Sequence, residues 1–163
     1  MILDDSCSLL THLAFVIGRQ ADQILQERLG IGNSQYRILA VLNTDNNALI
    51  GQKDIASRLG QTEASISRQV KELVNRGYIS IETNRLNRRK HEVTLTDKGA
   101  RIVSAAMEVL RNLYDQSMSL LVDKQRVQLK TALNLMHETI CASGNTAACD
   151  PLLRIWQMTD LGT

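Results

Sequence analysis

Residues 52–79 read QKDIASRLGQTEASISRQVKELVNRGYI, and this stretch decides the fold. Apolar residues recur at helical spacing on both sides of Gly60, which predicts two short helices. Gly60 is suited to the left-handed backbone conformation that ends a helix. Thr62 can cap the second helix, with Glu63 in its first turn and Gly77 after its end. The stretch therefore predicts two helices joined by a tight turn.

The second helix of this pair has an apolar side and a polar side. The apolar stripe, expected to be buried, consists of Ile66, Val70, Leu73 and Val74. The remaining faces carry Ser65, Ser67, Arg68, Gln69 and Lys71. Small hydroxyl groups allow close approach to DNA, and Arg68 and Gln69 can hydrogen-bond base edges or phosphates. We expect this helix to read DNA, with a merely solvated polar face as the alternative.

The next residues, 80–96, read SIETNRLNRRKHEVTLT and predict two strands joined by a basic tip. Within the seven residues 84–90 there is no acid, and four residues are basic: Arg85, Arg88, Arg89 and Lys90. Clustered positive charge is self-repulsive, and DNA phosphates would relieve that repulsion. A helix pair followed by a basic hairpin predicts a winged helix-turn-helix that binds double-stranded DNA. A solvated turn is the alternative for the tip.

Composition agrees with a small, mainly helical protein. The chain has 163 residues, 3% aromatic residues and one proline. Its net charge is only +2, but residues 51–100 hold ten basic and six acidic residues, a net of +4. The positive charge is thus concentrated around the predicted DNA-reading segment. The predicted fold class is mainly α with a small β-hairpin wing.

Several classes of protein are disfavoured. No apolar run approaches membrane-spanning length, and the N-terminus lacks the basic region of a signal peptide, so a cytoplasmic protein is expected. Three cysteines do not form a secreted disulfide framework. His12, His91 and His137 are widely separated, and no phosphate-binding glycine loop or nucleophile elbow occurs. We expect no metal, no cofactor and no enzymatic activity.

Four further helices are expected outside the helix pair. They are predicted at 6–29, from Asn33 or Ser34 through Leu42, at 98–120 behind Asp97 as N-cap, and at 123–140. Their expected inner residues include Leu9, Leu13 and Ile17 near the start, and Val127, Leu133, Met136 and Ile140 near the end. The resulting organisation is a dimerisation helix (1–32), a winged-helix lobe (33–100), further dimerisation helices (101–142), and a linker and tail (143–163).

The terminal helices are too long for the lobe to cover. Helices of this length span about 30 Å, which exceeds a small winged-helix lobe. We expect them to pack together and against a second copy, giving a homodimer with recognition helices roughly 34–36 Å apart. An intramolecular bundle is the alternative. A protein-interaction module is the rival function, and the tail residues Leu152, Leu153 and Trp156 are suited to docking a partner.

The chain resembles the multiple-antibiotic-resistance regulator (MarR) family of winged-helix repressors up to about residue 142. The matching pieces are 54–56 (DIA) with Leu59, 65–68 (SISR) with Leu73, 77–79 (GYI), 88–89 (RR) and 93–99 (VTLTDKG). The resemblance implies a homodimeric repressor of a pseudo-palindromic operator that a ligand or oxidant releases from DNA. It places residues 63–71 on the recognition helix and Arg89 in a narrow minor groove. Asn84 and Asn87 stand where the family usually has aspartates, so strong salt dependence is expected.

The resemblance also implies a place for a small aromatic or anionic inducer, between the DNA-binding lobe and the dimerisation helices. Candidate residues there are His12, Arg19, Tyr36 and Arg37. Arginine can pair with a carboxylate, and tyrosine or histidine can supply a ring contact or a hydrogen bond. The alternative is that these four are surface or interface residues.

The three cysteines offer a second possible trigger, because some family members sense peroxides through a thiol near the start of the first helix. Cys7 lies near that start, although Asp4 and Asp5 oppose thiolate formation there. Cys141 and Cys149 flank a glycine-bearing linker and are close enough in sequence to form a disulfide. Either can also pair with Cys7 if both termini share the dimerisation region. Inert thiols are the alternative.

Overall fold

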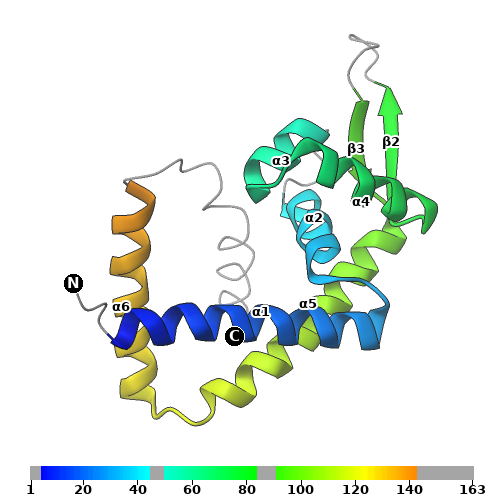
Figure 1. Cartoon of the computed structure of the whole chain (residues 1–163). Coiled ribbons are helices and arrows are strands. Elements are labelled where there is room, and N and C mark those ends of the chain that lie inside the picture. Colours follow the sequence, from blue (N-terminus) through cyan, green and yellow to red (C-terminus); the bar gives the residue numbers. More distant parts are fainter. Residues whose placement is uncertain (1–4, 45–49, 84–90, 143–163) are drawn as a thin grey trace.

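The computed structural model describes residues 5–44, 50–83 and 91–142, which form six helices and three strands (Figure 1). The helices are α1 (Asp5–Leu29), α2 (Asn33–Thr44), α3 (Gln52–Leu59), α4 (Glu63–Asn75), α5 (Asp97–Met118) and α6 (Asp123–Ala142). The strands are β1 (Ile50–Gly51), β2 (Ile79–Thr83) and β3 (His91–Leu95). The predicted fold class, mainly α with a small β-hairpin wing, is confirmed. The six helices lie where the sequence predicts them, within a few residues at each end.

The sheet has the strand order β1-β3-β2, and both pairings are antiparallel. β2 and β3 form the predicted hairpin, with Ile79 opposite Leu95 and Ile81 opposite Val93. β1 pairs Ile50 with Val93 and was not predicted. Two residues are too few to show the alternation that marks a strand. The hairpin projects beyond α3 and α4 at one end of the molecule (Figure 1).

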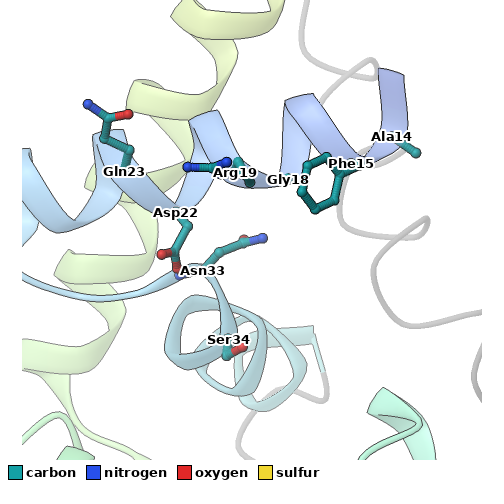
Figure 2. Close-up of a pocket in the computed structure, with 8 residues that line it drawn as sticks. All are labelled: Ala14, Phe15, Gly18, Arg19, Asp22, Gln23, Asn33 and Ser34. Carbon is teal, nitrogen blue, oxygen red and sulfur yellow. Dashed lines mark hydrogen bonds between the residues drawn. The ribbon is translucent and has the colours of Figure 1, made fainter. Parts of the chain in front are cut away.

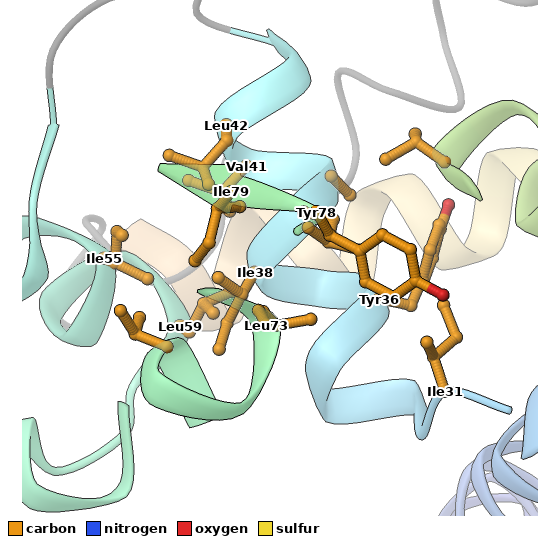
Figure 3. Packing of buried hydrophobic residues seen from close by; sticks show 14 of the residues in the cluster. Ile31, Tyr36, Ile38, Val41, Leu42, Ile55, Leu59, Leu73, Tyr78 and Ile79 are labelled. Atoms are coloured by element: carbon orange, nitrogen blue, oxygen red, sulfur yellow. The ribbon is translucent and has the colours of Figure 1, made fainter. Parts of the chain in front are cut away.

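The main core lies between α2, α3, α4 and the sheet. α2 buries Tyr36 and then the continuous run Ile38, Leu39, Ala40, Val41 and Leu42. Ile55 from α3, Leu73 from α4 and Ile79 from β2 converge on it (Figure 3). A fully buried leucine or isoleucine contributes about 1.5–3 kcal/mol, so these contacts fix α3 and α4 on α2.

The second layer is the pair α1 and α5. Ala21 and Leu25 of α1 are buried, as are Val103, Ala106 and Leu110 of α5. The two helices cross in Figure 1, below the lobe formed by α2–α4 and the sheet. The start of α5 follows directly from β3, so the hairpin and this layer share one continuous segment of chain.

The apolar stripes of the first and last helices are exposed in the single chain, so their burial against a second copy stays a prediction. Leu9 and Leu13 on α1 and Val127 and Ile140 on α6 are exposed, Val127 by 66% and Ile140 by 64%. α6 stands apart from the lobe in Figure 1, and none of its residues from 123 to 140 is buried. The lobe is too short to cover α1, which has 25 residues, and α6, which has 20, because an α-helix rises about 1.5 Å per residue.

A second correction concerns the start of α5. Thr96, not Asp97, is the N-cap: its hydroxyl accepts a hydrogen bond from the N–H of Gly99 at 3.0 Å. Asp97 is the first helical residue, where its charge still complements the helix dipole. No helix in the described part of the chain is long and apolar enough to cross a membrane.

Candidate nucleic-acid interface

The turn between α3 and α4 has the geometry that the sequence predicts. Gly60 has φ 61° and ψ 34°, the left-handed conformation. Its N–H donates to the carbonyl oxygen of Ser57 at 3.3 Å, and the N–H of Gln61 donates to the carbonyl oxygen of Ala56 at 3.0 Å. These two hydrogen bonds form the Schellman pattern of a helix end. Thr62 then caps α4 by accepting from the N–H of Ser65 at 3.2 Å. Backbone groups at the end of α3 and at the start of α4 thus have their hydrogen-bond partners within this short turn. The backbone of the turn therefore fixes the direction of α4.

α4 has one buried face and one exposed face. Ile66, Val70 and Leu73 are buried in the core, whereas Val74, expected to be buried, is partly exposed. Ser67, Arg68 and Lys71 are exposed, and no hydrogen bond or ion pair engages their side chains within the described residues. Two cationic side chains and a hydroxyl are therefore available on one surface of a rigidly held helix.

Ser65 and Gln69 behave differently from these three residues. Both are half-buried, and both bond to Gln61 in the turn. The Oε1 atom of Gln61 accepts from Ser65 Oγ at 3.3 Å and from Gln69 Nε2 at 3.1 Å. Gln69 Nε2 also donates to Ser65 Oγ at 3.2 Å, which closes a triangle of polar atoms. Sequence analysis missed Gln61, although its spacing of four and eight residues from Ser65 and Gln69 was visible.

The C-terminal half of α4 is tied to the turn between α1 and α2. Gln35 Nε2 donates to Glu72 Oε2 at 2.7 Å, and Arg76 Nη1 donates to the carbonyl oxygen of Gly30. These contacts join residues 37 and 46 positions apart. No local pattern predicts them, because they depend on how α1 and α2 pack beside α4.

The base of the wing is joined to the end of α4 and the start of α5 through the backbone carbonyl groups of residues 76–78. The carbonyl oxygen of Tyr78 accepts from the N–H of Thr96 at 3.1 Å and from Thr96 Oγ1 at 3.0 Å. Lys98 Nζ donates to the carbonyl oxygen of Arg76 at 2.7 Å and lies 4.9 Å from the ring centroid of Tyr78. From this base β2 and β3 stay paired as far as Thr83 and His91. The predicted contacts Arg88, Arg89 and Lys90 lie outside the described residues.

Two of the four predicted ligand residues, Arg19 and His12, line hollows on α1. Arg19 lines an open groove of about 640 Å³ between α1 and the start of α2, together with Phe15, Asn33 and Ser34 (Figure 2). Its guanidinium carbon lies 5.9 Å from the ring centroid of Phe15. At the floor, Asp22 Oδ1 accepts from the N–H of Asn33 at 2.7 Å and so occupies the N-terminus of α2. His12 lines a separate hollow.

On α2, Tyr36 is buried and Arg37 is half-buried. Burial, assisted by Tyr114, raises the pKa of Tyr36 to about 12. Burial also lowers the pKa of Arg37. The Tyr36 hydroxyl and the Arg37 Nε are buried without a hydrogen-bond partner among the described residues. They are therefore groups that a bound molecule could satisfy, and neither residue lines the groove at Arg19 or the hollow at His12.

Of the three cysteines, the structure describes the side-chain surroundings of Cys7. Cys7 is a free, exposed thiol on α1, in the same hollow as His12. Cys141 falls near the end of α6, and Cys149 lies outside the described residues. Among the described residues no three acidic, histidine or cysteine side chains are grouped as metal ligands would be.

The fold and this polar surface define a winged helix-turn-helix protein. Residues 29–90 match the family model described as MarR family, and this segment contains α2, α3, α4 and β2, the first strand of the wing. The resemblance to the MarR family that the sequence predicts is thereby confirmed. No curated protein sequence matched the chain.

Solved structures of the same fold cover most of the chain. MepR of Staphylococcus aureus, a transcription regulator of the multidrug efflux pump MepA, matches 81% of this chain and 96% of its own with TM-score 0.69 and 23% identity. A MepR–DNA complex covers 85% and 99%, with TM-score 0.68 and 24% identity. A cysteine-to-serine mutant of MarR from E. coli covers 83% and 98%, with TM-score 0.73 and 20% identity. At these identities the likeness shows the fold.

Proposed function

We propose that this protein is a sequence-specific DNA-binding transcriptional regulator, a repressor that binds a pseudo-palindromic operator as a homodimer. The observation that carries the proposal is the exposed face of α4, where Ser67, Arg68 and Lys71 have no partner among the described residues. A helix fixed by a cap and a buried stripe is the form in which winged-helix proteins enter the major groove. The MarR family match and the DNA-bound MepR of the same fold support it.

The DNA-contacting residues are assigned separate roles. Arg68 and Ser67 contact base edges or nearby phosphates, and Lys71, Arg88 and Lys90 contact phosphates. Arg89 at the wing tip enters the minor groove, where a narrow A·T-rich segment attracts a guanidinium. Ser65 and Gln69 lie at the edge of this surface. The concentration of positive charge in residues 51–100 supports the assignment.

The proposed homodimer would cover the apolar residues that the single chain leaves exposed. Phe15 is 62% exposed on α1, and Leu120 is 85% exposed between α5 and α6. Both terminal helices carry such residues along their length, and isolated helices that are apolar on one side are unstable in water. Packing α1, α5 and α6 against a second copy would bury them.

Two triggers for release are consistent with the surface. A small anionic or aromatic molecule would find Arg19, the donors of Asn33 and Ser34, and the ring of Phe15 in the groove between α1 and α2. An oxidant would reach the exposed thiol of Cys7. Measuring operator affinity with aromatic carboxylates and with peroxide, each in wild type and in Cys7→Ser, separates the two.

The test of DNA binding is selection from random duplexes at moderate salt, followed by sequencing. An inverted repeat with half-sites about one helical turn apart is expected. Arg68→Ala should change the preferred sequence, whereas Arg111→Ala, which removes an exposed arginine from the middle of α5, should not. Affinity should fall steeply with salt because phosphate contacts release counterions. No retained DNA from reduced, refolded protein would instead favour a protein-interaction module.

A further inference from the structure

In the polar triangle of Gln61, Ser65 and Gln69, the amide donors with which Gln69 would read a base are already hydrogen-bonded within the protein. Both amide hydrogens of Gln69 have acceptors inside the protein, Gln61 Oε1 at 3.1 Å and Ser65 Oγ at 3.2 Å. Its Oε1 atom is buried and has no partner among the described residues. Glutamine reads adenine by donating to N7 while accepting from N6–H. In this arrangement Gln69 can do neither.

Gln61 is well placed to hold this arrangement. Its backbone N–H is fixed to Ala56 at 3.0 Å by the turn, and the next residue is the N-cap of α4. Gln61, Ser65 and Gln69 are spaced by four residues, so the second and third lie one helical turn apart on the same side of α4. The acceptor of Gln61 is thus presented by a rigid turn to two side chains of the recognition helix.

We propose that Gln61 is a specificity-determining positioning residue, which holds the Gln69 side chain against α4 and away from the bases. The proposal rests on DNA binding as the function. The base pair opposite Gln69 is then not read, and sequence preference comes from Ser67 and Arg68, whose side chains have no described partner. A polar residue in the turn, which need not touch DNA, sets which positions of the operator are distinguished.

Two substitutions of Gln61 test this proposal. Gln61→Met keeps the length of the side chain but removes the amide acceptor, and so releases Gln69. Gln61→Glu keeps an acceptor for Gln69 and Ser65 but adds a negative charge near phosphates. The matched control is Gln26→Met, which removes an exposed amide from α1. All four proteins are compared by random-duplex selection at the same salt, and their fold is checked by thermal unfolding.

Wild type is expected to show one position in each half-site without base preference next to the positions it reads. Gln61→Met should gain a preference for adenine there, by roughly fivefold or more, the lower end of what a bidentate contact gives. Adding Gln69→Ala should abolish the gain. Gln61→Glu should bind more weakly overall but keep the wild-type preference, and Gln26→Met should match wild type.

Other outcomes overturn the proposal. If Gln61→Met selects the same sequences as wild type, or if Gln69→Ala removes a preference that wild type already has, Gln61 does not withhold Gln69. The side-chain amide signal of Gln69 in NMR gives a second test without DNA: its hydrogen-bonded shift should be lost in Gln61→Met and kept in Gln61→Glu. A failure of wild type to bind any duplex refutes the proposed function, while the NMR result still decides whether Gln61 positions Gln69.

Discussion

Gly99 in the first turn of α5 allows a test of how closely the wing base must pack. A Cβ atom at this position would lie 2.0 Å from the carbonyl oxygen of Tyr78, where real Cβ contacts stay above 3.0 Å. Gly99→Ala must therefore separate α5 from the end of α4 by about 1 Å. The carbonyl of Tyr78 cannot simply rotate away, because the N–H of Thr96 donates to it and the Thr96 hydroxyl shares its hydrogen between the carbonyl oxygens of Tyr78 and Gly77.

The size of the effect follows from these contacts. Weakening two hydrogen bonds costs about 1 kcal/mol each, and forcing an extra methyl group into a filled site costs about 1–3 kcal/mol. Alanine recovers about 1 kcal/mol of helix propensity relative to glycine. The free energy of unfolding should fall by about 2–4 kcal/mol, which lowers the melting temperature by roughly 4–16 °C in a chain of this size.

The control is a second helical glycine with open space around it. A Cβ atom added at Gly18 in α1 would meet no neighbouring group within 4 Å. Gly18→Ala should therefore raise the free energy of unfolding by about 0.5–1 kcal/mol. Thermal unfolding by circular dichroism, at one protein concentration for all variants, measures both changes. A Gly99→Ala protein as stable as wild type would refute the close packing of Gly99 on Tyr78.

Three further substitutions probe the core, the cap and the wing. Tyr36→Phe removes a buried hydroxyl without a described partner and should stabilise the protein by about 1 kcal/mol in urea unfolding. Because the pKa of Tyr36 is raised to about 12 while unfolded tyrosine ionises near 10, wild type should lose stability as pH rises from about 10 to about 12, and the variant should lose less. Thr62→Ala removes the N-cap of α4 and should cost about 1 kcal/mol, visible as a lower urea midpoint. Arg89→Ala should weaken DNA binding and flatten its salt dependence with dimer and melting temperature intact; unchanged affinity at moderate salt would exclude the wing role.

The fold was largely predictable because its signals are local. Gly60 predicts the end of one helix and Thr62 the start of the next. The stripe of Ile66, Val70 and Leu73 predicts a buried face. The hairpin follows from alternating residues around a polar tip. β1 was missed because two residues are too few to show the alternation of a strand. The N-cap of α5 was misplaced by one residue because threonine and aspartate are both good caps.

The site was less predictable, because the sequence shows which face a residue occupies but not what it bonds to. Periodicity places Ser65, Arg68 and Gln69 on the polar side of α4, yet only the structure separates the exposed Arg68 from the bonded Ser65 and Gln69. Tyr36 was expected to be available to a ligand, whereas it is 3% exposed. Tertiary packing decides which of these side chains is bonded or buried. It brings together residues that are too far apart in the sequence for a local pattern to predict the contact.

The contacts around α4 also limit how the protein can respond to a ligand. Gln35 and Gly30 hold its C-terminal half from the side of the α1–α2 turn, and Lys98 holds the same end from α5. Exposed hydrogen bonds of this kind contribute about 0.5–1.5 kcal/mol each. A ligand in the groove between α1 and α2 would break them only if it bound the rearranged protein more tightly than the described conformation by at least their combined free energy. Any rotation of α1 against α2 must then either carry α4 with it or release it, and both would change the distance between two recognition helices in the proposed dimer.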